Sequence, residues 1–160
     1  MQRSRTIAVA GLAALLSAAA PEPIWHVGVT EAGAPFAAVY DEDERAPMLR
    51  FECTPDRLVA TAFRTEEPLE QEAGDDGPKP VRVKLTTDKV DPGWVEGQAV
   101  RNAGGGRDLT TFLPFDHPAF LAFPRAEFIG LISKDGGSLS VVEKGDRKRL
   151  AEFVRQCRGG

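Results

Sequence analysis

The chain has 160 residues, of which 42% are hydrophobic and 28% charged, and its formal net charge is −4 at pH 7. This length suits one globular domain that can bury a substantial core. The mild acidity argues against binding to nucleic acid, because affinity for phosphate comes largely from basic side chains. It also argues against electrostatic docking on anionic lipid.

Residues 1–19 have the pattern of a cleavable signal peptide. Arg3 and Arg5 form a positively charged start, an apolar run covers 7–16, and small residues lead to a cleavage site that we place after Ala19. The apolar run is shorter than the roughly 20 residues that span a bilayer. We therefore expect a periplasmic or secreted bacterial protein with no transmembrane segment after cleavage of the leader.

Residues 20–160 are predicted to form a single β-rich domain, because short segments alternate between apolar and polar residues. Turn residues separate these segments; the sequence at 54–56, for example, indicates a hairpin. In chain order, the predicted strands span 24–30, 36–40, 48–53, 57–64, 81–86, 94–100, 108–113, 128–133 and 139–143. A glycine at position 97 is expected to interrupt the strand at 94–100.

Helices are predicted at two places in the second half of the chain. The first is a short helix that contains Phe120 and Leu121. Asp116 is a favourable N-cap for it, Pro118 is tolerated in its first turn, and Pro124 limits its length. A longer helix is expected after a cap at Asp146 and ends near Cys157. Its apolar stripe follows the i, i+3, i+4, i+7 spacing of a helix packed on a core and consists of Leu150, Phe153, Val154 and Cys157.

Cys53 and Cys157 are the two cysteines of the chain, and an even count in an exported protein indicates a disulfide. Cys53 alternates with Leu49 and Phe51 on the apolar face of its strand, and Cys157 continues the helix stripe. Two buried free thiols are the alternative, and the pair lacks the spacing of a zinc site. The sequence thus predicts a mainly β fold, either an antiparallel β-sandwich or a partly closed barrel, with one C-terminal α-helix docked by a disulfide.

No residue pattern supports catalysis, a metal site or a cofactor. His26 is expected to face solvent, His117 is interpreted as a capping or surface residue, and no serine is held against either imidazole by a recognised motif. The glycines at 104–106 fit neither a P-loop nor a dinucleotide-binding pattern. The acidic segments 41–44 and 66–76 lack the register of an EF-hand and are interpreted as solvated loops.

Aromatic residues are the more informative feature. They are dense between residues 112 and 123, where core packing is the default interpretation for most of them. If part of this segment is exposed, it forms an apolar patch suited to a protein partner. The candidate partner-binding residues are Phe112, Phe115, Phe120, Phe123 and Trp94.

The outline of the chain also resembles a known group of proteins. The features that carry the resemblance are an early Trp25, a strand ending in a cysteine at 49–53, a central Trp94, and a helix ending in a cysteine at 153–157. In this respect the chain is similar to the small exported proteins of the VasI-like kind, which are accessory to type VI secretion in proteobacteria. The resemblance implies a disulfide, an envelope location and, as an expectation, a role in secretion.

Two functions remain open from the sequence. The first is a non-catalytic exported binding or accessory domain that contacts another envelope or secreted protein through the region 112–123 or through an open sheet edge. The alternative is a small secreted hydrolase, or an inhibitor of an envelope hydrolase. A deep polar cleft around His117 or around paired carboxylates would favour the alternative.

Overall fold

The computed structural model describes residues 24–40, 47–65, 77–103, 106–134, 139–143 and 147–159. The predicted leader, the two acidic segments and the predicted helix cap at Asp146 lie outside these residues.

Every predicted strand segment forms a strand, with ends shifted by one or two residues at most. The strand at Gly97 is continuous rather than interrupted, because it is hydrogen-bonded to a neighbour on each side. The strands are β1 (Ile24–Val29), β2 (Pro35–Tyr40), β3 (Pro47–Cys53), β4 (Leu58–Thr65), β5 (Lys79–Thr87), β6 (Val95–Arg101), β7 (Arg107–Leu113), β8 (Phe128–Ser133) and β9 (Leu139–Glu143).

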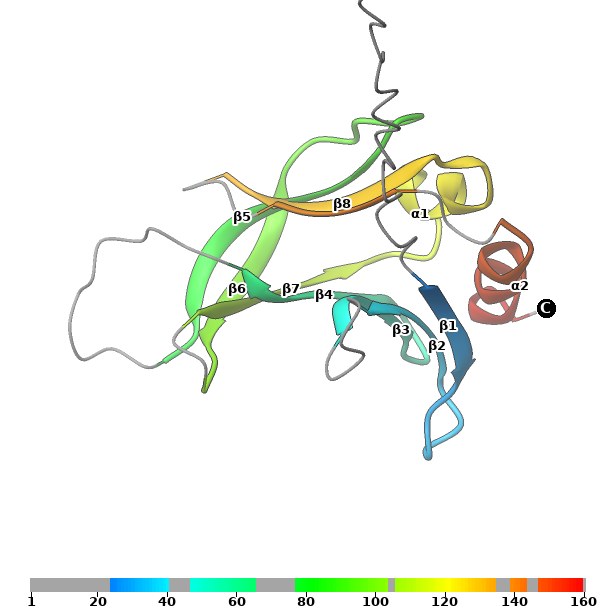
Figure 1. The fold of residues 1–160 in the computed structure, drawn as a ribbon, viewed down its shortest axis with the longest axis horizontal. Helices are drawn as coiled ribbons and strands as arrows, with labels where there is room; N and C mark the ends of the chain where they lie inside the picture. Colours follow the sequence, from blue (N-terminus) through cyan, green and yellow to red (C-terminus); the bar gives the residue numbers. More distant parts are fainter. Residues whose placement is uncertain are drawn as a thin grey trace, which may run out of the picture.

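All nine strands belong to one antiparallel sheet in the order β1-β2-β3-β4-β7-β6-β5-β8-β9. The sheet curls so that β5 and β8 lie over β2, β3 and β4, with the bend in β5, β6 and β7 (Figure 1). β9 accordingly contacts β3 and β4 across the interior without pairing with them. Because β1 and β9 remain edges of one sheet, the fold is a curled half-barrel, in agreement with the predicted partly closed barrel.

At Gly97, β6 passes close to the strands on both sides of it. A Cβ atom added there would lie 2.8 Å from Val83 Cγ2 and 2.8 Å from the backbone oxygen of Thr110. Any larger residue would therefore push β6 away from the strands on either side of it. Glycine in a strand interior commonly marks such a tight bend.

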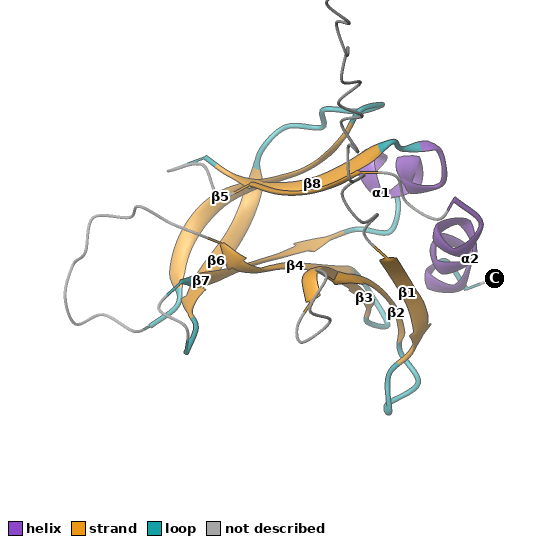
Figure 2. Ribbon diagram, in the orientation of Figure 1, coloured by secondary structure: helices purple, strands orange, loops and turns teal. Residues whose placement is uncertain are grey.

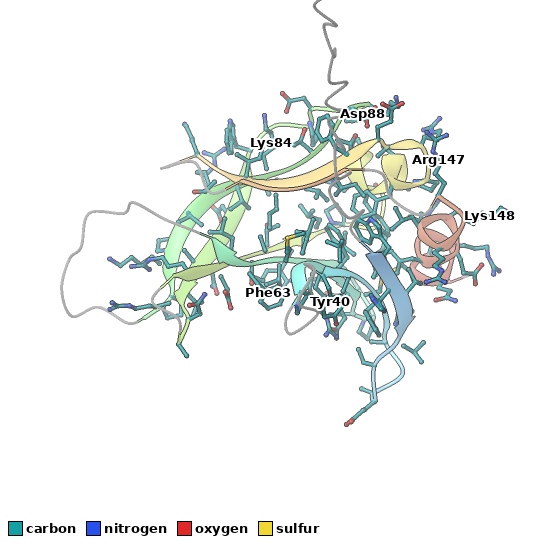
Figure 3. All side chains as sticks on the ribbon, in the orientation of Figure 1. Tyr40, Phe63, Lys84, Asp88, Arg147 and Lys148 are labelled. Carbon is teal, nitrogen blue, oxygen red and sulfur yellow. A yellow bond between two sulfur atoms is a disulfide. The ribbon has the colours of Figure 1, made fainter. Side chains whose placement is uncertain are left out.

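The inner face of the half-barrel carries the core. Side chains in β3, β5 and β7 alternate between buried and less buried positions, as a half-buried strand requires. Side-chain sticks accordingly fill the space between the two layers of the curled sheet (Figure 3). The buried inner residues of these strands include Leu49, Phe51, Cys53, Val81, Val83, Leu85, Leu109, Thr111 and Leu113.

Three helical segments cover the open end of the half-barrel, opposite the bend (Figure 2). These are α1 (Pro118–Ala122), the 3₁₀ segment η1 (Phe123–Arg125) and α2 (Arg147–Cys157). The N-cap of α1 is His117 and not the predicted Asp116, because Pro118 takes the first helical position. The His117 side chain makes no capping hydrogen bond.

A chain of five aromatic rings joins the sheet to these helices. Trp25 of β1 stacks on Phe51 of β3 with centroids 6.2 Å apart, and Phe51 meets Phe123 edge-on at 4.7 Å. Phe123 then contacts Phe120 at 5.4 Å, and Phe120 contacts Phe153 of α2 at 5.8 Å. Each separation is typical of a favourable aromatic pair, so one continuous core runs from the first strand to the last helix.

The predicted disulfide is confirmed. Cys53 at the end of β3 bonds to Cys157 at the end of α2, their Cα atoms are 5.5 Å apart, and 104 positions separate them in sequence. Both cysteines are buried. The bond therefore fixes the last turn of α2 to the sheet at the point where the aromatic chain ends.

Replacing both cysteines, as Cys53→Ala with Cys157→Ala, should lower the free energy of unfolding by about 4–5 kcal/mol, because a loop of this length is freed in the unfolded chain. Urea unfolding monitored by tryptophan fluorescence measures the change. A reducing agent should destabilise the unmodified protein similarly and leave the double variant unaffected. Equal stability of the two proteins under oxidising conditions would show that the disulfide contributes nothing.

Candidate protein-contact surface

Two of the predicted partner-binding residues are core residues. Phe120 and Phe123 are 0% exposed and lie in the middle of the aromatic chain. They cannot contact a partner in this structure, so their assignment to a binding surface is corrected. The physical reason is that α1 and η1 close the half-barrel and need large apolar side chains on their inner side.

The other three predicted residues differ in exposure. Phe115 is partly buried and packs against the core. Trp94 is also partly buried, whereas the Phe112 side chain is 50% exposed. Phe112 is therefore the most exposed of the five candidates, and it is the strongest of them for a contact with another molecule.

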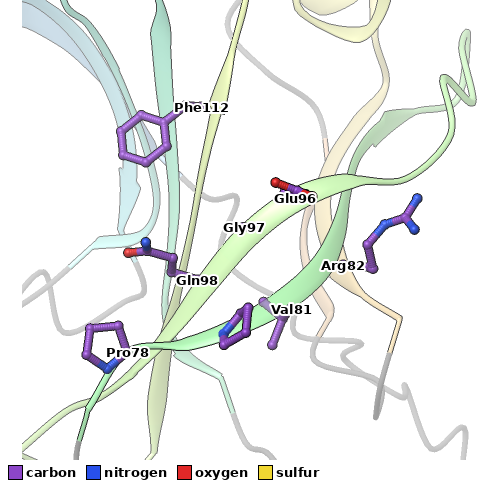
Figure 4. A pocket seen from close by; sticks show the side chains of 8 residues that line it. Pro78, Val81, Arg82, Glu96, Gly97, Gln98 and Phe112 are labelled. Carbon is purple, nitrogen blue, oxygen red and sulfur yellow. The ribbon is translucent and has the colours of Figure 1, made fainter.

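Phe112 lies beside a groove of about 490 Å³ on the outer face of the sheet. Its inward neighbours on β7, Thr111 and Leu113, are buried, so strand alternation turns Phe112 outward. The groove runs over β5 and β6, whose residues appear as sticks in Figure 4. It is lined by Pro78, Pro80, Val81, Arg82, Glu96, Gly97, Gln98 and Phe112.

An arginine flanks the exposed aromatic ring. The Arg57 guanidinium carbon lies 5.7 Å from the centre of the Phe112 ring, a cation–π geometry. Arg57 also donates a hydrogen bond of 2.9 Å from Nε to Asp56 Oδ2, and this bond lowers the pKa of Asp56. Arginine beside an exposed aromatic residue is a composition enriched in protein interfaces.

Trp94 does not line the groove but is hydrogen-bonded to a residue that does. Arg82, which lines the groove, donates a hydrogen bond of 3.2 Å from Nη2 to the backbone oxygen of Trp94. Lys84 Nζ lies 5.0 Å from the Trp94 ring centre and 2.8 Å from Asp91 Oδ1, and this pairing lowers the pKa of Asp91. The structure thus brings Phe112 and Trp94 to one outer face, linked through Arg82.

Several lining residues were not identified from the sequence. Arg82, Glu96 and Gln98 occupy outward positions of their strands, and their sequence pattern resembles that of any solvated face. One feature of the sequence could have identified them: they alternate with the buried positions of β5 and β6, as Phe112 alternates with the buried positions of β7, so all four side chains belong to the outer face. Strand pairing, which sets Arg82 opposite Glu96, could not be read from that alternation.

The two histidines have different surroundings. His26 is exposed, as predicted, and meets Tyr40 edge-on with centroids 5.0 Å apart. His117 is 7% exposed, which corrects its interpretation as a surface residue. Its Nδ1 atom is buried with no hydrogen-bond partner among the described residues. Burial lowers the pKa of His117, while nearby Asp116 opposes this shift.

The hydrolase hypothesis gains no support from this geometry. The outer groove contains a single carboxylate, from Glu96, and His117 does not line it. In the part of the chain that the structure describes, no three histidine, cysteine, aspartate or glutamate residues are grouped to hold a metal ion. In comparisons with known proteins, no family profile, curated protein or solved structure matches the chain.

Truncation of Phe120 should cost much more stability than truncation of Phe112. Phe120→Ala should cost about 3–5 kcal/mol of unfolding free energy, because it leaves a cavity in the aromatic chain. Phe112→Ala should cost about 1 kcal/mol or less, because half of the ring is already in water. Parallel urea unfolding curves test both. A large loss for Phe112→Ala would assign that ring to the fold rather than to a contact surface.

His117 should make the protein less stable as the pH falls. Its pKa is lower in the folded protein than its ordinary value of 6.5, so the unfolded chain takes up the proton first and is favoured below that pH. Unfolding free energies at pH 7.5 and 5.5 should differ, and His117→Gln should reduce the difference. Asp56 and Asp91 also have lowered pKa values, but these carboxyls change the free energy of unfolding only below about pH 4. They therefore do not contribute to the difference between pH 7.5 and 5.5. An unchanged difference in His117→Gln would contradict the assignment.

Proposed function

We propose that the protein is a non-catalytic binding or accessory domain that acts through protein–protein contact, with the surface around Phe112 as its contact site. The observation that carries the proposal is a half-exposed phenylalanine beside a groove, on a strand whose inner residues are fully used in the core. Exposed aromatic residues with nearby arginine are frequent anchors of protein interfaces.

The groove favours a protein partner over a small ligand. Its lining mixes proline, aromatic and aliphatic carbon with the polar groups of Arg82, Glu96 and Gln98, which suits the apolar centre and polar rim of an interface. It is open along the face of the sheet, so that a bound side chain or turn of a partner would stay in contact with Phe112.

We further propose that the protein is exported and that its partner is another envelope or secreted protein. The support is the leader-like sequence of residues 1–19 and the Cys53–Cys157 disulfide, a bond that persists in oxidising compartments. None of the described helices is long and apolar enough to cross a bilayer. A role in type VI secretion remains the prediction that the VasI-like resemblance implies.

A photo-crosslinking amino acid at position 112 tests the contact surface. In cells of the source organism, position 112 should give a discrete crosslinked adduct with one other protein. The matched control is position 100, because Val100 is 37% exposed and lies on the same outer face of the neighbouring strand but outside the groove.

Substitution gives the corresponding loss of function. Phe112→Ala should abolish co-purification of the crosslinked protein, since it removes the anchor and leaves the core intact, whereas Val100→Ala should retain it. Equal adducts at both positions, or co-purification that survives Phe112→Ala, would argue against this surface.

A further inference from the structure

The edge strand β1 presents unused backbone hydrogen-bonding groups. The Thr30 N–H donates to the Ala34 oxygen across the first hairpin at 2.8 Å, so the amide and carbonyl of Thr30 point toward β2. Backbone groups alternate in direction along an antiparallel strand. The N–H and C=O groups of Trp25, Val27 and Val29 therefore point away from the sheet.

The last helix covers one end of this edge and leaves the other end open. Arg149 of α2 donates a hydrogen bond of 3.2 Å from Nη1 to the backbone oxygen of Trp25. In the described part of the chain, the outward groups of Val27 and Val29 make no such bond. An edge with free donors and acceptors is a template for an added strand.

A second groove, of about 410 Å³, lies between this open edge and α2. Val29 is 63% exposed beside it, the most exposed large apolar side chain among the described residues. The groove is lined by Val27, Gly28 and Val29 of β1 and by Lys148, Arg149, Glu152 and Gln156 of α2. A sheet edge and a helix flank thus form its two walls.

The helix wall is cationic. Lys148 and Arg149 are exposed, and Lys148 has no ion-pair partner among the residues the structure describes. Glu152, the single carboxylate of the wall, is already bound: it accepts hydrogen bonds from Arg155 Nε at 3.1 Å and from Gln156 Nε2 at 2.8 Å. A segment entering the groove therefore meets the positive charge of Lys148, in a chain whose total charge is negative.

We propose that the groove between β1 and α2 binds an extended acidic segment of a partner protein by strand addition. The segment would hydrogen-bond to the outward groups of Val27 and Val29. Its alternate side chains would then point to the face of the sheet that carries α2. Acidic residues at every second position would lie against Lys148. This proposal is independent of the Phe112 surface, which lies on the outer face of the sheet.

A second copy of the chain is a poorer occupant. Two β1 edges paired about a two-fold axis would keep both α2 helices on the same side of the joined sheet. The walls that carry Lys148 and Arg149 would then face like charges, which is unfavourable. Charge complementarity favours an acidic strand.

Synthetic peptides test the proposal against the full mature protein with its disulfide intact. The first has glutamate at every second position and threonine between, and the second replaces each glutamate by lysine. Fluorescence anisotropy should show the glutamate peptide binding at least about tenfold more tightly at low salt, and this preference should shrink as salt screens the charges. Equal binding of the two peptides, or no binding of the glutamate peptide at millimolar concentration, overturns the proposal.

N-methylated peptides test the backbone contacts. In a strand added at an edge, alternate amides face the protein and the others face away. Methylating one alternate set should weaken binding by about tenfold or more, whereas methylating the other set should have little effect. NMR shifts on binding should centre on the amides of Val27 and Val29. Equal sensitivity to both sets, or shifts centred on β7, overturns strand addition.

Protein variants complete the test. Val29→Pro removes an outward N–H that no described residue uses, and Lys148→Glu reverses one charge of the wall; each should weaken binding by about tenfold. The control is Arg158→Glu, which makes the same charge change just after α2. The proposal is overturned if both variants bind the glutamate peptide as tightly as the unmodified protein, or if Arg158→Glu weakens binding as much as Lys148→Glu does. It is also overturned if the protein forms a concentration-dependent dimer that Val29→Pro abolishes.

Discussion

Closure of the open end of the half-barrel is the constraint on which the rest of the structure depends. A sheet that curls without joining its edges leaves its inner apolar face open on one side. Five aromatic rings, running from Trp25 through Phe51 and Phe123 to Phe153, fill that opening and bind α1 and α2 to the sheet. The disulfide holds the last turn of α2 in the same place. Loss of the disulfide or of one of the rings would weaken this closure.

This closure determines which surfaces remain for contact with other molecules. Because the inner face is occupied by core and helices, the candidate sites are the outer face and the edges. Phe112 and its groove use the outer face over β5, β6 and β7. The groove at β1 exists because α2 lies beside the edge strand, bound to it through Arg149 and Trp25. The same helix that completes the core thus forms one wall of a second surface.

The sequence predicted the strands well because each half-buried strand carries its own alternation, as at Leu49, Phe51 and Cys53. The turn at 54–56 correctly predicted that β3 and β4 form a hairpin. The sequence did not show the long-range pairings, since the contact of β4 with β7 depends on long connections and not on a local pattern. An aromatic cluster suits a core as well as an interface, so the burial of Phe120 and the exposure of Phe112 could not be distinguished. The groove residues have no chemical signature that sets them apart from ordinary solvated positions.

The position of the disulfide has a consequence for how the chain matures. Cys157 lies at the end of the last helix, 104 positions after Cys53. When the chain is synthesised from its N-terminus, Cys53 and β4 are complete well before Cys157 and β7, the cysteine and the strand with which they pair. Pairing at such sequence distances is slow. Until Cys157 is present, the Cys53 thiol has no intrachain partner, so the covalent link that fixes α2 can form only as the last helix is completed.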